Sequence, residues 1–146
     1  MGPKPMICPT LLAEIISLHQ RYTAAADSFD GTAFALCFTE DGTLDRPDGI
    51  YKGHKALTSL LNPTGSMKRR HFFMPPLLIS QENGMISGTG YCLYFECEIE
   101  SGRLNPPVPI DYQDTYHDTS EGWLIFHRKV GPAFPKNDHR PPIARS

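Results

Sequence analysis

The feature that most limits the fold of this chain is a change of hydrophobic pattern near its middle. In the first thirty residues, apolar positions recur at spacings of four and three, which is typical of one face of an amphipathic helix. These positions are Leu11, Ile15, Leu18, Tyr22, Ala25 and Phe29. From residue 69 onward the pattern is that of strands separated by turn residues. Helices grouped before strands, rather than alternating with them, predict an α+β fold.

The helical half is predicted to hold three helices and one short hairpin. The first helix follows Pro9, with Thr10 as its N-cap. A break near Asp30 separates it from a second helix at 33–38, which Asp30 can cap. The other elements expected here are strands at 43–46 and 50–52 and a helix at 53–61.

The second half is predicted to form four long strands, at 69–79, 85–98, 110–118 and 123–130. Asn83-Gly84 is a strong hairpin signal, and Gly88 and Gly90 suggest the bend that curls a sheet. Pro75-Pro76 marks an edge or a bulge within the first strand. The whole pattern predicts a strongly curved antiparallel sheet that forms a cone, with the helices packed on its concave side.

Length and composition indicate one domain and narrow the classes of partner. The chain of 146 residues suits a single core. We expect a flexible N-terminus at 1–9, the domain at 10–130, and a Pro-rich tail at 131–146 that either floats or covers an opening. The net charge of −2 argues against nucleic acid as a partner. No stretch reaches the ~20 apolar residues of a membrane span, and no secretory signal is present, so we expect a cytoplasmic protein.

One histidine lies in an apolar, aromatic strand and is the leading candidate for catalysis. In Lys68–Met74, alternation places His71 and Phe73 on one face. An imidazole that lines a cavity can carry protons near neutral pH. The alternative is a structural histidine that is hydrogen-bonded within the core.

Several segments in order resemble the nuclear transport factor 2-like superfamily, in its SnoaL-like branch. They are Tyr22 through Asp30, Phe38-Thr39-Glu40-Asp41-Gly42, Gly53-His54-Lys55-Ala56, Arg70-His71-Phe72, and Tyr112 through Tyr116 with Glu121-Gly122-Trp123 and Arg128. The resemblance implies an α+β barrel-like cone. The superfamily includes polyketide cyclases, scytalone dehydratase, ketosteroid isomerase, epoxide hydrolases and non-catalytic carriers, so fold alone does not decide function.

The resemblance to scytalone dehydratase implies a catalytic dyad. In that enzyme an aspartate after the first helix holds a strand histidine, and the matching positions here are Asp30 and His71. Phe29 occupies the place of a tyrosine that polarises the substrate there. A carboxylate on one imidazole nitrogen raises the basicity of the other. The alternative for Asp30 is that it only caps the second helix.

Other candidates would bind the substrate. They are Tyr51, Tyr91 and Tyr112 as phenols that could stabilise an oxyanion, together with Phe29 and Phe73 as apolar contacts. Each tyrosine could equally be an ordinary sheet residue. For Asp114 a cross-strand ion pair with Arg128 is favoured over a catalytic acid.

These observations predict a cofactor-independent acid–base enzyme of secondary metabolism. It would cyclise, isomerise or dehydrate a polyketide- or terpenoid-like molecule in an apolar cone. No metal site is expected, since the remaining histidines, His19 among them, show no common face with a carboxylate. The resemblance also implies a homodimer. The alternative function is a non-catalytic module of the same fold that binds a small molecule or a partner.

Overall fold

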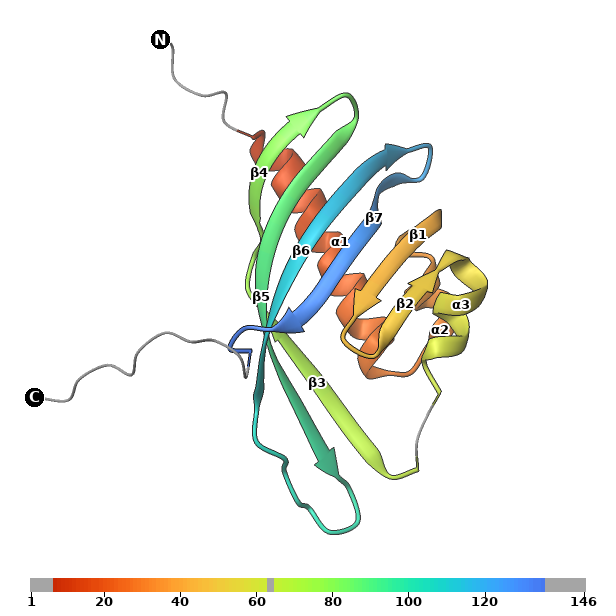
Figure 1. Cartoon of the computed structure of the whole chain (residues 1–146), viewed down its shortest axis with the longest axis vertical. Coiled ribbons are helices and arrows are strands. Elements are labelled where there is room, and N and C mark those ends of the chain that lie inside the picture. The colour runs from red at the N-terminus through yellow and green to blue at the C-terminus, as the bar shows by residue number, and fades with distance from the viewer. Residues whose placement is uncertain (1–6, 63–64, 136–146) are drawn as a thin grey trace, which may run out of the picture.

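The computed structural model describes residues 7–62 and 65–135 as helices packed against a curved sheet (Figure 1). The helices are α1 (Pro9–Asp27), α2 (Gly31–Ala35) and α3 (Gly53–Leu60). The strands are β1 (Phe38–Arg46), β2 (Gly49–Lys52), β3 (Met67–Phe73), β4 (Leu77–Glu82), β5 (Met85–Glu98), β6 (Val108–Thr119) and β7 (Gly122–Pro132). The predicted α+β class is confirmed.

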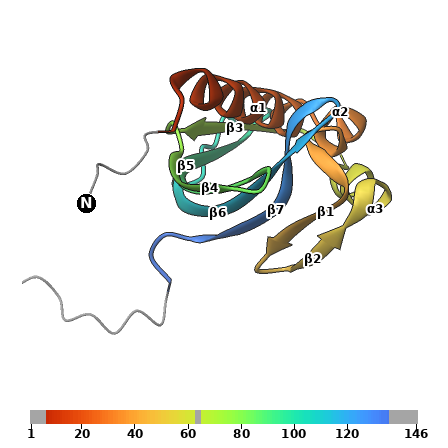
Figure 2. The same cartoon turned by 90° about the horizontal axis from the view of Figure 1, so that it is seen from above.

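The sheet has the strand order β2-β1-β7-β6-β5-β3, and β4 also pairs with β5. All pairs are antiparallel except β1 with β7, which run parallel, so the sheet is mixed rather than purely antiparallel. Seen from above, the sheet curves beneath α1, which lies across its inner face (Figure 2). The strands do not close into a barrel, because β2 and β3 remain as separate edges.

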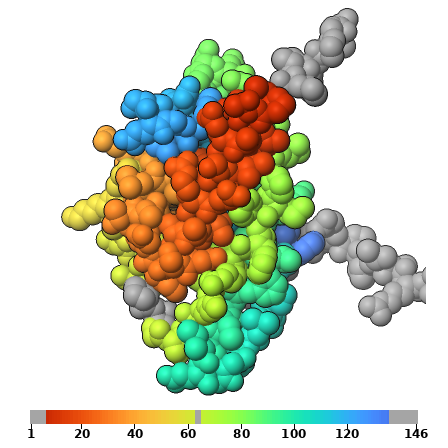
Figure 3. Space-filling view, turned by 180° about the vertical axis from the view of Figure 1, so that it is seen from behind, coloured from red at the N-terminus to blue at the C-terminus, as the bar shows by residue number. Residues whose placement is uncertain are grey.

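Helix α1 supplies one wall of the core. Its buried side chains include Leu11, Ile15, Leu18, Tyr22 and Ala25, which are five of the six positions of the predicted stripe. The N-cap is Cys8, two residues before the predicted cap at Thr10, and Pro9 opens the first turn. From the opposite side of Figure 1, the red and orange helical segment crosses the body of the molecule diagonally (Figure 3).

The chain reverses sharply between α1 and α2. Phe29 adopts a left-handed conformation with φ of 57°, and the Asp30 N–H donates to the carbonyl of Ala25 at 2.9 Å. The Asp30 side chain then accepts from the Ala33 N–H at 3.0 Å, so the predicted cap is confirmed. Helix α2 ends at Ala35, earlier than predicted, because β1 already pairs with β7 at Phe38.

The strand predicted at 69–79 is two strands. β3 pairs with the C-terminal half of β5 and β4 with its N-terminal half. Pro75-Pro76 separates them, because a proline has no N–H to continue the ladder. The turn at Asn83 and Gly84 has positive φ at both residues, as a type I′ hairpin requires.

Some sequence-based predictions fall outside the described residues. These are most of the flexible N-terminus (residues 1–6) and most of the Pro-rich tail (residues 136–146). Strand β7 continues to Pro132, two residues past the predicted end of the domain. None of the helices in the described ranges has the length and apolar character needed to cross a membrane.

Candidate acid–base site

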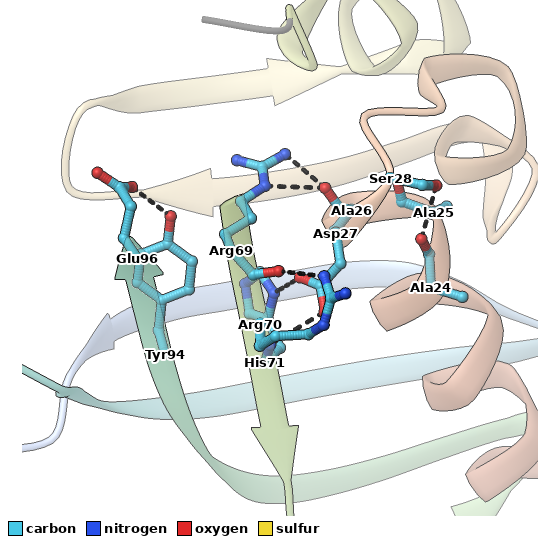
Figure 4. Close-up of polar contacts among 10 residues, drawn as sticks. All are labelled: Ala24, Ala25, Ala26, Asp27, Ser28, Arg69, Arg70, His71, Tyr94 and Glu96. Atoms are coloured by element: carbon cyan, nitrogen blue, oxygen red, sulfur yellow. Dashed lines mark hydrogen bonds and ion pairs between the residues drawn. The ribbon is translucent and has the colours of Figure 1, made fainter. Parts of the chain in front are cut away.

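The end of α1 holds His71 by two hydrogen bonds to one carboxylate (Figure 4). Asp27 is the last residue of α1, and His71 lies on β3, an edge strand of the sheet. Asp27 Oδ1 lies 2.6 Å from His71 Nδ1, and Asp27 Oδ2 accepts from the His71 backbone N–H at 3.1 Å. The carboxylate thus satisfies an edge-strand N–H and orients the imidazole at the same time.

This arrangement defines which imidazole nitrogen is available. A carboxylate only accepts hydrogen bonds, so Nδ1 of His71 carries the proton that bonds to Asp27. In the neutral ring, Nε2 then presents a lone pair. The side chains of His71 and Asp27 remain 14% and 11% exposed, so the pair is shielded but can be reached from solvent. His71 is therefore arranged as a base.

The prediction that Asp30 holds His71 is wrong in its geometry. Asp30 lies beyond the reversal at Phe29, and its carboxylate caps α2 instead. Asp30 was given this role by the resemblance to scytalone dehydratase, in which the aspartate follows the first helix. The helix ends at Asp27, so that residue projects from its last turn onto β3. One feature of the sequence does indicate that the helix ends at Asp27: the next residue is Ser28, which is unfavourable inside a helix.

Three further side chains, Tyr94, Glu96 and Arg69, share this end of the sheet, and sequence reasoning did not place Tyr94 or Arg69 at the site. In the β3–β5 register, His71 lies opposite Tyr94 and Arg69 lies opposite Glu96. The rings of His71 and Tyr94 are 4.8 Å apart between centroids. The Tyr94 hydroxyl donates to Glu96 Oε2 at 2.5 Å. Burial, then the hydrogen bond to Glu96 and its charge, raise the pKa of Tyr94 to about 12.

Arg69 ties β3 to the end of α1. Its Nε and Nη2 both donate to the carbonyl of Ala26, at 2.8 and 2.6 Å. The guanidinium also lies 4.0 Å from the ring centroid of Phe29. Phe29, predicted to contact substrate, therefore lies beside the dyad but is already covered by Arg69.

The other predicted substrate contacts are distributed over the sheet. Phe73 lies two residues after His71 on the same face, and its ring is 5.5 Å from that of His19. Tyr91 is on the opposite face of the sheet and 66% exposed. Tyr51 is on β2 at the other edge of the sheet, where its hydroxyl donates to Asp48. Tyr51 and Tyr91 therefore do not line the site around His71.

Tyr112 and Asp114 belong to a second polar group, which is fully buried. Arg128 donates to Asp114 through Nε at 2.8 Å and Nη2 at 2.9 Å, which confirms the predicted cross-strand ion pair. The guanidinium lies 4.4 Å from the ring of Tyr22 and 4.0 Å from that of Tyr112. Asp114 also accepts from the Tyr116 hydroxyl at 2.7 Å.

His19 joins this buried group, contrary to the prediction that it faces no carboxylate. Its Nε2 lies 2.7 Å from the Tyr116 hydroxyl oxygen and 3.7 Å from Asp114. Because Tyr116 gives its proton to Asp114, His19 Nε2 donates to the Tyr116 oxygen, which leaves Nδ1 to accept from Arg128 Nη2 at 3.3 Å. Burial and then the charge of Arg128 lower the pKa of His19 to about 3, so the ring is neutral. The sequence could have indicated this burial, because His19 lies four residues after Ile15 and three before Tyr22 and so shares the apolar face of the helix.

Two hollows lie near β3. One of about 530 Å³ borders Asp27 and Phe29 at the free edge of β3, beside Lys68 and Arg70. The other, of about 710 Å³, is mostly apolar and is lined by Phe72, Phe73, Met74, Tyr91, Cys92, Leu93, Pro109, Ile110, Asp111, Ala133 and Phe134. His71 lines neither hollow. Neither of them is therefore the enclosed apolar pocket that was predicted around His71.

Within residues 7–62 and 65–135, no three His, Cys, Asp or Glu side chains are grouped so as to hold a metal ion.

Comparison with known proteins defines the family. The model of the SnoaL-like domain matches residues 10–129. The chain belongs to the SnoaL-like domain family. This family lies within the nuclear transport factor 2-like superfamily, as the resemblance of the sequence motifs implied. No curated protein matches the chain by sequence.

Solved structures of several other proteins share the fold. ActVI-ORFA of Streptomyces coelicolor has a TM-score of 0.76 and 24% identity, covering 85% of this chain and 98% of that one. A nuclear transport factor 2-like protein with a cystatin-like fold from Novosphingobium aromaticivorans has a TM-score of 0.73 and 23% identity, covering 86% and 83%. A putative aromatic ring hydroxylase of the same species has a TM-score of 0.76 and 21% identity, covering 88% and 94%.

Proposed function

We propose that this SnoaL-like chain is a cofactor-independent acid–base enzyme in which His71 moves the proton and Asp27 orients it. The observation that carries the proposal is the pair of hydrogen bonds from one carboxylate to the ring and the backbone of His71. They fix the tautomer and leave Nε2 as the available base. Membership of a superfamily that includes polyketide cyclases and scytalone dehydratase supports a polyketide- or terpenoid-like substrate.

The chemistry follows from that geometry. His71 Nε2 takes a proton from a substrate carbon or hydroxyl, and the resulting imidazolium is stabilised by Asp27. The proton then returns to another substrate atom. Return to a different carbon is an isomerisation, and return to a departing hydroxyl releases water. If the carbanion first attacks a carbonyl of the same molecule, the proton neutralises the new alkoxide and the product is a ring.

Replacing His71 and each of the two candidate aspartates in separate variants tests the proposal. With polyketide or terpenoid intermediates as substrates and product mass as readout, we expect His71→Gln to lower turnover roughly 10²–10⁴-fold. Asp27→Asn is expected to lower turnover as well, because the amide can donate its own hydrogen to Nδ1 and so favour the wrong tautomer.

Asp30→Asn is the matched control, because asparagine caps a helix as well as aspartate does. We expect this variant to retain turnover within about twofold. Loss of activity in Asp30→Asn together with full activity in Asp27→Asn would contradict the assignment. A wild-type chain that retains such a ligand but never converts it would favour the alternative, a non-catalytic binding module.

We also propose that the chain forms a homodimer through the outer face of its sheet. Large apolar side chains there are strongly exposed: Phe72 61%, Met74 59%, Leu77 68%, Ile79 62%, Tyr91 66% and Leu93 43%. Contiguous apolar surface of this kind marks an interaction site. The superfamily resemblance points to a second copy as the occupant, since such chains pair through the sheet.

Light scattering coupled to size-exclusion chromatography tests the dimer. We expect twice the 16.3 kDa chain mass for the wild type and the monomer mass for Leu93→Glu. Leu104→Glu, at a residue 58% exposed outside the named strands, is the control and should stay dimeric. A monomeric wild type at micromolar concentration would refute the proposal.

A further inference from the structure

The dyad is one end of a row of polar side chains on the inner face of the sheet. We call Tyr94 and Glu96 of β5, together with His71 of β3, the acceptor row. Tyr94 lies opposite His71 in the register, and Glu96 lies two residues further along the same face. All three side chains are partly exposed, so a ligand that reaches one can contact the others.

Each member of the acceptor row presents a hydrogen-bond acceptor. The Nδ1 proton of His71 bonds to Asp27, which leaves a lone pair on Nε2. The hydroxyl proton of Tyr94 bonds to Glu96 Oε2 at 2.5 Å, which leaves lone pairs on the phenol oxygen. The second oxygen of Glu96 can only accept. The ligand that complements this row is a hydrogen-bond donor.

Arg69 determines what kind of donor fits. Arg69 lies opposite Glu96 in the β3–β5 register, and its positive charge disfavours an ammonium ligand nearby. Arg69 Nε and Nη2 both donate to the Ala26 carbonyl, so the side-on edge of the guanidinium is occupied. The neighbouring carboxylates of Asp27 and Glu96 disfavour an anionic ligand. A neutral hydroxyl group is the donor that remains.

We propose that Tyr94 and Glu96 bind a phenolic or enolic hydroxyl of the molecule on which His71 acts. The ligand is thus a neutral hydroxylated compound rather than a carboxylic acid or an amine. This inference rests on the proposed function, because it takes His71 as the reacting group. Tyr94 and Glu96 are positioning residues in this scheme: they hold the hydroxyl while Nε2 of His71 faces the reacting atom.

Binding of two matched probes tests the inference without any turnover. Resorcinol offers two hydroxyl donors, and 1,3-dimethoxybenzene has the same ring without them. By NMR titration we expect resorcinol to bind the wild type at least about tenfold more tightly, since a hydrogen bond to a charged group contributes about 1.5–3 kcal/mol. The His71 ring signals should shift during the titration. Benzoate and benzylamine should bind at least about tenfold more weakly than resorcinol.

Single variants show which residues cause the preference for resorcinol over 1,3-dimethoxybenzene. Glu96→Met is expected to make the two probes bind equally, and Tyr94→Phe, which keeps the ring against His71, should reduce the preference while leaving the ether unaffected. Glu98→Met removes a carboxylate two residues along the same strand and should retain the wild-type preference. Equal binding of both probes to the wild type, or a preference that survives in both Glu96→Met and Tyr94→Phe, would overturn the inference.

The outcome is separable from that of the proposed function. If turnover depends on His71 and Asp27 while the preference for resorcinol is independent of Glu96, only the hydroxyl-binding role fails. If the preference depends on Glu96 but His71→Gln and Asp27→Asn convert substrate like the wild type, only the catalytic role fails.

Discussion

Replacing Arg128 by methionine is expected to lower the free energy of unfolding by about 3–5 kcal/mol. Arg128 is 0% exposed and bonds Asp114 through two nitrogens. Its removal leaves the Asp114 carboxylate charged in the core, with only the Tyr116 hydroxyl as a partner. The cation–π contacts of the guanidinium with the rings of Tyr22 and Tyr112 are lost as well. Urea unfolding followed by circular dichroism measures the change.

Arg46→Met is the matched control for this variant. Arg46 also pairs with an aspartate, Asp48, but their side chains are 36% and 51% exposed. Exposed pairs contribute about 0–1 kcal/mol, so this variant should unfold nearly as the wild type does. Adding Asp114→Leu to Arg128→Met should recover part of the loss, because no buried charge then remains. An Arg128→Met chain within about 1 kcal/mol of the wild type would contradict this account.

The second large effect is a loss of stability in mild acid that depends on His19. In the folded chain the pKa of His19 is lowered from 6.5 to about 3, whereas the unfolded chain binds a proton as the pH falls through 6.5. The neutral ring therefore stabilises the fold fully above pH 6.5, and that stability is lost progressively as the pH falls toward 3. Between pH 7 and pH 5 the expected loss from this residue is about 2 kcal/mol.

Comparison with His19→Gln isolates that contribution. Glutamine can still donate to the Tyr116 oxygen but does not titrate, and the carboxylates and other histidines are the same in both chains. We expect the variant to be less stable at pH 7 and to lose about 2 kcal/mol less than the wild type on going to pH 5, by urea unfolding at both values. Equal losses would show that His19 titrates normally in the fold.

Periodicity predicted the elements whose pattern is strong and local. The stripe of α1, the turn at Asn83-Gly84 and the full extent of β5 were all readable, because each depends on residues close together in the chain. The parallel pairing of β1 with β7 was not readable. The two strands are more than eighty residues apart in the sequence, and no local feature near Phe38 indicates that it pairs with β7.

The sequence predicted a histidine–aspartate pair and identified the histidine, but it did not identify the aspartate. His71 was found because it precedes two phenylalanines on a predicted strand and matches the strand histidine of scytalone dehydratase. Asp114 with Arg128 followed from counting across a hairpin. Asp27 was missed because a shift of three residues at the end of a helix decides which carboxylate faces β3. Boundaries of that precision depend on the left-handed turn at Phe29, which an apolar aromatic side chain does not signal.

The sequence by itself determined that this chain has helices before strands, one histidine on an apolar strand, and the motifs of its superfamily. Only the tertiary structure decided that Asp27 orients that histidine, that Tyr94 and Glu96 stand beside it, and that His19 is buried with Arg128. Hydrophobic spacing specifies which face of each element is buried. The pairing of polar side chains depends on where element ends meet and on strand register, which are set by packing across the whole chain.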